Sequence, residues 1–176
     1  FGGGLDRFDQ DTGRFRHLRS DSTDPATLGS DFIRLAYQDR QGLLWVGTQG
    51  GLLRFNPQTE AFTLYAHEPG NVRSLSHQEV TSIHQDRSGR LWVATDGGGL
   101  NRFEPSTETF VRYTDKDGLP SNIVLGILED AQGNLWLSTA GGVSRFDPKT
   151  ETFENYDISD GLQSNVFVGA ACQSSN

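Results

Sequence analysis

The sequence predicts an all-β fold made of β-propeller blades, each with four antiparallel strands. The main evidence is a stretch that occurs three times, as DRQGLLWVGTQGGLLRF, DRSGRLWVATDGGGLNRF and DAQGNLWLSTAGGVSRF. Its tryptophans, Trp45, Trp92 and Trp136, are 47 and 44 residues apart. A period in the mid-forties with four short strand-like runs per unit is typical of propeller blades, whereas helical repeats place apolar residues three and four apart.

Strand A of each predicted blade is a short apolar run rich in β-branched residues. Such a run suits an inner strand that is packed on both faces. The four copies are Phe32 to Gln38, Val80 to Gln85, Ile123 to Glu129 and, without a partner strand, Val166 to Ala171.

A four-residue turn follows strand A, with aspartate first and glycine fourth. Aspartate accepts backbone N–H bonds in such turns, and glycine tolerates the positive φ of a bulged hairpin. The three turns are Asp39 to Gly42, Asp86 to Gly89 and Asp130 to Gly133. Three acids at one repeated position could resemble a catalytic set, but each belongs to a different blade, so we interpret them as turn residues.

Strand B carries the tryptophan, and a glycine pair or triplet leads from it into strand C. A phosphate-binding loop would also need a following helix and a nearby lysine, and the sequence has neither. Strand C carries an arginine before a repeated phenylalanine, and we expect it to stack on the tryptophan of strand B, with ligand binding as the alternative. These arginines are Arg7, Arg54, Arg102 and Arg145.

Strand D begins with an aromatic residue and leads to the next strand A through polar loops of two lengths. Two loops are long, after Arg19 and from His67, and two are shorter, from Asp115 and from Ser159. The chain varies most in these loops. Variable loops on a rigid scaffold are where binding residues concentrate, so we expect function there.

The blade pattern divides the chain into three complete blades and two partial ones. We expect complete blades at 32–66, 78–114 and 122–157, strands C and D of another blade at 1–18, and strand A of the next at 166–171. Because the chain begins within a repeat and contains no methionine, we expect a segment of a larger propeller. Such an open arc exposes strand edges and apolar blade faces, so it should be prone to association.

Composition and charge exclude several classes of partner. The net charge is −8 over 176 residues, and no cluster of lysine and arginine is present. Nucleic acids and anionic membranes require such clusters, so we expect neither a nucleic-acid partner nor direct membrane contact. The single cysteine, Cys172, cannot form an internal disulfide bond.

The sequence offers no catalytic constellation, and we expect neither a metal site nor a cofactor. The four histidines do not occupy equivalent repeat positions, and no third ligand stands at a metal-binding spacing near His67 and His77. No serine lies in a nucleophile elbow. Residues that break the repeat pattern are better candidates for ligand contact, and we name Arg73, His77 and Asp96.

DRSGRLWVATDGGGLNRF followed by FVRY, with DGLPSN before strand A, resembles the two-component regulator propeller repeat of bacterial sensor proteins. The resemblance covers nearly the whole chain. It implies seven-bladed propellers, often two in tandem, outside the cytoplasmic membrane. In that family a β-sandwich, a membrane helix and a histidine kinase follow the propellers.

The resemblance implies a ligand-sensing module on the periplasmic or extracytoplasmic side that binds a carbohydrate-like small molecule and performs no catalysis itself. Its other partners would be the remaining blades of the same propeller, and we allow for a homodimer of the full-length protein. One alternative is a metal-dependent propeller enzyme similar to streptogramin lyase, although no residue set maps onto that enzyme. Another is a structural or protein-binding propeller of a secreted protein.

Overall fold

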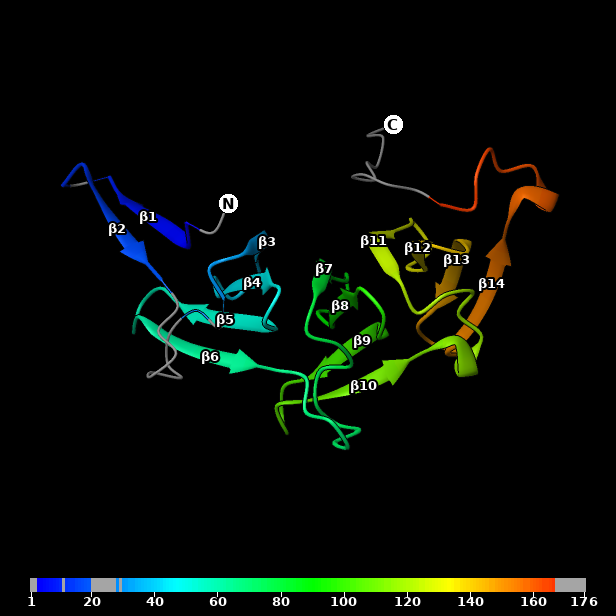
Figure 1. Cartoon of the computed structure of the whole chain (residues 1–176), viewed down its shortest axis with the longest axis horizontal. Coiled ribbons are helices and arrows are strands. Elements are labelled where there is room, and N and C mark those ends of the chain that lie inside the picture. Colours follow the sequence, from blue (N-terminus) through cyan, green and yellow to red (C-terminus); the bar gives the residue numbers. More distant parts are fainter. Residues whose placement is uncertain (1–2, 11, 20–27, 29, 167–176) are drawn as a thin grey trace.

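The computed structural model describes residues 3–10, 12–19, 28 and 30–166. Within these ranges the chain forms a two-stranded sheet and three four-stranded antiparallel sheets, arranged side by side along an open arc (Figure 1). The predicted all-β fold of propeller blades is therefore confirmed. Beyond Val166, the expected last strand A lies outside the described residues.

Each four-stranded sheet is a meander in which sequential strands pair with each other. β3, β7 and β11 lie on the concave side of the arc, and β6, β10 and β14 lie on the convex side (Figure 1). The strands are β1 (Leu5–Asp9) and β2 (Arg14–Leu18); β3 (Ile33–Gln38), β4 (Leu44–Thr48), β5 (Leu52–Asn56) and β6 (Ala61–Tyr65); β7 (Val80–Gln85), β8 (Leu91–Thr95), β9 (Gly99–Glu104) and β10 (Thr109–Tyr113); β11 (Val124–Glu129), β12 (Leu135–Thr139), β13 (Gly142–Asp147) and β14 (Thr152–Tyr156). Two short 3₁₀ helices, Asp115–Asp117 and Ile158–Asp160, follow β10 and β14.

The predicted turn after each inner strand is present, and its aspartate makes one bond that the sequence analysis did not foresee. One carboxylate oxygen of Asp86 accepts the backbone N–H of Arg90, while the other accepts the indole N–H of Trp92 at 2.9 Å. Asp39 and Asp130 bind Trp45 and Trp136 in the same way, at 2.8 and 3.0 Å. The glycines at the fourth position have the expected positive φ, 83°, 87° and 86°.

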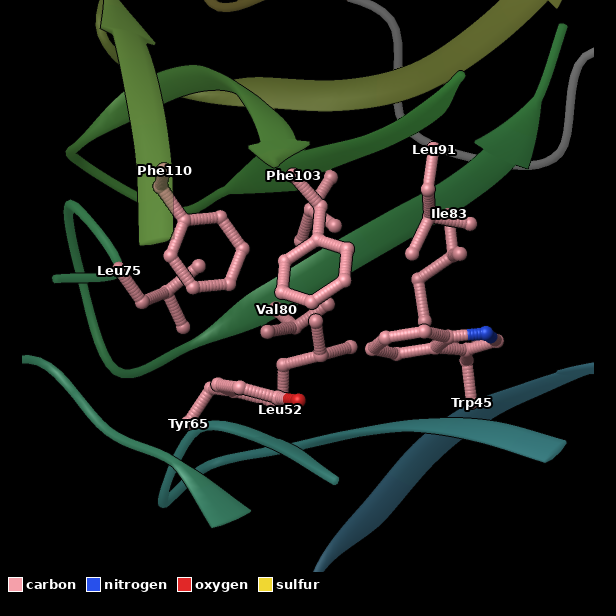
Figure 2. Close-up of a cluster of buried hydrophobic side chains, with 10 residues drawn as sticks. Trp45, Leu52, Tyr65, Leu75, Val80, Ile83, Leu91, Phe103 and Phe110 are labelled. Carbon is pink, nitrogen blue, oxygen red and sulfur yellow. The ribbon is translucent and has the colours of Figure 1, made fainter. Parts of the chain in front are cut away.

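Aromatic side chains form the cores between neighbouring sheets. Trp45 and Tyr65 of the second sheet pack against Phe103 of the third, with ring centroids 5.1 and 5.2 Å apart (Figure 2). The next interface repeats this arrangement, since Trp92 and Tyr113 pack against Phe146 at 5.5 and 5.0 Å. Each four-stranded sheet thus presents a tryptophan–tyrosine pair on one face and a phenylalanine pair on the other.

The strand C arginines stack as predicted in two sheets. The guanidinium carbon of Arg54 lies 5.9 Å from the centre of the Trp45 ring, and that of Arg102 lies 6.0 Å from that of Trp92. Arg145 of β13 instead pairs with Glu154 of β14.

In the first three sheets, the strand C arginine also contacts a glutamate of the following sheet, a contact that the sequence analysis missed. Arg102 lies 2.7 Å from Glu151, and the Tyr113 hydroxyl donates to the same carboxylate at 2.8 Å. The bonds from Tyr113 and Arg102 lower the pKa of Glu151. The equivalent pairs are Arg54 with Glu108 at 2.7 Å and Arg7 with Glu60 at 3.2 Å.

The three glutamates have a backbone conformation that is unusual for their residue type. Glu60, Glu108 and Glu151 have φ values of 57°, 54° and 55°, in the left-handed region that favours glycine. Each lies in a C–D turn, at the fifth position counted from the last residue of strand C. At this position its carboxylate forms an ion pair with the arginine of the preceding sheet.

Replacing Asp86 with asparagine is expected to lower the free energy of unfolding by about 2 kcal/mol at pH 7. Asparagine removes the charge that pairs with Arg90, and its N–H₂ group cannot accept a bond, so some of the donors of Trp92 and Arg90 lose their acceptor. Urea denaturation measures the change. Asp130→Asn is the matched control and should cost less, because Asp130 is more exposed. An Asp86→Asn variant as stable as the wild-type chain would contradict this role.

The stabilisation by Asp86 is expected to disappear in acid. Burial raises the pKa of Asp86, but the hydrogen bonds from Trp92 and Arg90 outweigh it and hold the pKa below its usual 3.8. A carboxyl group with a lowered pKa stabilises the fold above its unfolded pKa and loses this effect as the pH falls through the folded value. The stability gap between the wild-type chain and Asp86→Asn should therefore narrow below pH about 4. A gap that stays constant in urea titrations from pH 7 to 3 would refute this.

Candidate functional site

The two ends of each sheet differ in what they carry. Because strand direction alternates along a meander, the A–B and C–D turns share one end, and the B–C turns share the other end with the connections between sheets. We call the second end the loop end. The connections between the sheets therefore begin and finish at this end of the arc.

At the loop end, one backbone position is held in the same way before β3, β7 and β11, and again at Val166. Its N–H donates to a side chain two residues earlier, at 3.1 to 3.2 Å. The four residues at this position are Phe32, Glu79, Ile123 and Val166. With the backbone fixed in each copy, only the side chain varies from one sheet to the next.

The B–C turns complete this arrangement. Asp96 donates its backbone N–H to the carbonyl of Glu79 at 2.9 Å, and it also forms a β-bridge with Ile123 of the next sheet. Gln49 and Ala140 make the same backbone bond to Phe32 and Ile123, respectively, at 3.2 and 3.1 Å. We call these residues the inner rim: Phe32, Gln49, Glu79, Asp96, Ile123, Ala140 and Val166.

The inner rim combines exposed apolar side chains with acids. Phe32, Ile123 and Val166 are 48%, 36% and 51% exposed, although each is a large hydrophobic residue. Glu79 is paired with Arg34 of the preceding sheet at 2.7 Å. Apolar surface beside a few fixed polar groups is typical of small-molecule sites.

His77 departs from the repeat in sequence but keeps a structural role. Its Nδ1 accepts the backbone N–H of Glu79 at 3.2 Å, a bond that serine Oγ makes at the equivalent positions of the other sheets. Its ring lies over Gly97, because a Cβ atom there would be only 3.6 Å from Cδ2 and Nε2. The structure therefore places His77 beside the turn that carries Asp96.

Arg73 lies elsewhere. Its carbonyl accepts the backbone N–H of Phe110 at 2.8 Å, which places it beside β10 on the convex side of the arc (Figure 1). The Arg112 guanidinium holds the same loop by donating to the carbonyls of Asn71 and Ser74, at 2.6 and 2.9 Å. Of the three candidates named from the sequence, His77 and Asp96 belong to the loop end, and Arg73 belongs to the outer edge.

The sequence analysis missed the apolar residues of the inner rim. Phe32, Ile123 and Val166 were assigned to strand A as ordinary core residues. The signal that could have found them is their position, since each follows a polar loop and stands two residues after a serine.

Within the described ranges, no group of three His, Cys, Asp or Glu side chains could hold a metal ion. The same residues include no helix that is long and apolar enough to cross a membrane.

Comparisons with known proteins agree with the fold. A family model described as two component regulator propeller matches residues 27–50, 74–97 and 112–141. No curated protein matches the sequence.

Two similar solved structures are extracellular domains of putative hybrid two component systems from B. thetaiotaomicron. That of BT4673 has a TM-score of 0.74 and 23% identity over 92% of this chain, and that of BT3049 has 0.73 and 22% over 93%. The chain spans 23% and 21% of their lengths.

Virginiamycin B lyase from Staphylococcus aureus is also similar, with a TM-score of 0.62 and 16% identity over 88% of this chain and 48% of the lyase. At these identities, each of the three structures supports the fold alone.

Replacing His77 with serine and with alanine tests whether its turn hydrogen bond stabilises the fold. We expect His77→Ser to preserve the free energy of unfolding within about 0.5 kcal/mol, because serine makes this bond elsewhere in the chain. His77→Ala should lower it by about 1 kcal/mol. Chemical denaturation compares the two variants, and equal losses in both would show that the turn bond is not what His77 contributes.

Proposed function

Because the chain belongs to the two component regulator propeller family, we propose that it is a ligand-sensing segment of a bacterial two-component sensor. Two of the similar structures are described as extracellular domains of hybrid two component systems, which supports this assignment. In this proposal the chain performs no catalysis itself. It lies on the periplasmic or extracytoplasmic side of the membrane, and a histidine kinase elsewhere in the full-length protein reads its bound state.

We place the ligand at the inner rim. The observation that carries this choice is that the rim repeats one fixed backbone position, while its side chains are exposed or partly exposed and differ from sheet to sheet. A binding surface needs rigid geometry with local chemical variety. The aromatic cores and the Arg–Glu pairs between sheets lack this chemical variety, since they repeat nearly unchanged.

The chemistry of the rim fits a carbohydrate-like ligand. The half-exposed ring of Phe32 offers an apolar platform for the C–H face of a sugar ring. The carboxylates of Asp96 and Glu79 can accept hydrogen bonds from hydroxyl groups, and Nε2 of His77, whose Nδ1 is an acceptor, can donate one. Arg73, at the outer edge, would contact only a ligand long enough to reach across the blade.

A metal-dependent enzyme similar to streptogramin lyase is the second candidate, and its support is the shared fold alone. A protein-binding propeller is the third, and the exposed apolar residues of the rim would suit it as well. The varied polar groups beside Phe32 favour a small polar ligand over a flat protein surface.

Titration calorimetry with a panel of oligosaccharides tests the proposed site. We expect at least one oligosaccharide to bind the chain, and Phe32→Ala and Asp96→Asn each to weaken it about tenfold, the effect of losing one good polar or stacking contact. Gln58→Ala, on an exposed turn at the opposite end, is the matched control and should bind as the wild-type chain does. Equal affinity in all four proteins would exclude the inner rim, and no binding across the panel would exclude a carbohydrate ligand.

A further inference from the structure

The four histidines of the chain differ in what their hydrogen bonds require of the ring. His17 and His84 each face a carboxylate, at 2.6 and 3.3 Å. Nδ1 of His67 lies 2.9 Å from the carbonyl oxygen of Leu75, which can only accept, so this nitrogen must donate. A protonated ring donates from both nitrogens, so protonation preserves all three of these contacts.

His77 is the exception. Its Nδ1 accepts the backbone N–H of Glu79 at 3.2 Å, and a backbone nitrogen can only donate. The bond therefore exists only while Nδ1 carries no proton, which means while the ring is neutral. Because both nitrogens of a protonated ring carry hydrogen, no orientation of that ring can restore the bond.

The repeat shows that an acceptor at this position need not be a histidine. At the equivalent positions, Phe32, Ile123 and Val166 donate the same backbone N–H to a serine hydroxyl oxygen at 3.1 Å. A serine hydroxyl accepts without titrating, so those bonds do not depend on pH. Histidine side chains take up a second proton as the pH falls from about 8 to 5. Histidine in place of serine thus makes one of these bonds depend on pH.

Glu79 connects the bond of His77 to the rest of the rim. Its carbonyl oxygen accepts the backbone N–H of Asp96 at 2.9 Å, and its carboxylate pairs with Arg34 of the second sheet at 2.7 Å. One residue thus holds together the loop before β7, the B–C turn of its own sheet and a strand of the preceding sheet. Losing the bond at its N–H releases the backbone at the junction of these three elements.

The elements around His77 carry acids and bases that do not change charge in the range where histidine does. The ring lies over Gly97 of the B–C turn, and the connection before β11 reaches the same turn, because the Asn122 carbonyl accepts the Gly97 N–H at 3.1 Å. The charged groups of these elements are Arg34, Glu79, Asp96, Asp115, Lys116 and Asp117. Carboxylates ordinarily titrate near pH about 4, and lysine and arginine above pH about 10. Among these groups and His77, the charge that changes between pH 8 and 5.5 is therefore that of His77.

We propose that His77 is a pH-responsive residue whose protonation releases the backbone of Glu79 and so alters the inner rim between the second and third sheets. The neutral ring holds the rim in its present geometry, and the bond is lost as the pH falls through the range in which histidine is protonated. This change occurs in the protein without ligand. Its consequence, an affinity for ligand that depends on pH, rests on the proposed function.

Urea denaturation of the ligand-free chain at pH 8 and at pH 5.5 tests the proposal, with His77→Ser as the matched control. At pH 8 we expect the two proteins to unfold at nearly the same urea concentration, because serine makes this bond elsewhere in the chain. At pH 5.5 the midpoint of the wild-type chain should lie about 0.5 M below that of His77→Ser, the effect of losing one hydrogen bond. The other histidines titrate in both proteins, so their contributions cancel. Equal midpoints at both pH values, or a wild-type chain that is the more stable protein in acid, would overturn the proposal.

The backbone amides of Glu79 and Ile123 locate the change, because they donate the same bond to His77 and Ser121 within one molecule. In hydrogen exchange followed by NMR, we expect the protection factor of the Glu79 amide to fall about tenfold between pH 8 and 5.5, and that of Ile123 to stay constant. In His77→Ser both should stay constant. An equal loss at both amides of the wild-type chain would show a general loosening of the loop end and would refute the assignment to His77. Neither measurement uses a ligand, so this proposal and the proposed function can fail separately.

Discussion

The hydrogen bond from the strand B indole to the turn aspartate organises each sheet. It satisfies the N–H group of a large ring that must be buried, and it fixes the side of the sheet on which that ring lies. Trp92 is then positioned to pack on Phe146 of the next sheet, and Arg102 is positioned to stack over it. A turn residue thereby determines how two sheets meet, because the aspartate that closes the hairpin also orients the ring at the interface.

Repetition of this unit leaves few places where the chain can vary without cost. The aromatic core, the Arg–Glu pair and the turn carboxylate each join a residue of one sheet to a partner in the same sheet or the next. Replacing either residue therefore leaves its partner without its contact or hydrogen bond. The backbone of the inner rim is fixed by bonds that do not involve the side chains of Phe32 and Ile123, so these side chains can vary without breaking a pair. His77 illustrates the principle, because it replaces a serine and still makes the bond of that serine.

The same interface explains the character of the two ends of the arc. An interface that repeats between sheets has two unlike halves, and an open arc exposes one of each. The repeat changes at both ends, since Glu154 supplies a carboxylate from its own sheet and Gly13 takes the turn position that a glutamate holds elsewhere. These departures cannot be recognised in a single blade, because they appear only when the third and fourth sheets are compared with the β1–β2 hairpin.

The sequence by itself determined the blade architecture, the turns and the stacking of Arg54 and Arg102, because each depends on residues close together in the chain or repeated at a constant period. It also identified His77 and Asp96 as departures from the pattern. Only the tertiary structure decided that Arg73 belongs to the outer edge, that Phe32, Ile123 and Val166 share one exposed position, and that Arg102 binds Glu151 of the next sheet. Those relations join residues of different sheets, and the spacing along one chain does not specify which atoms the twist of neighbouring sheets brings into contact.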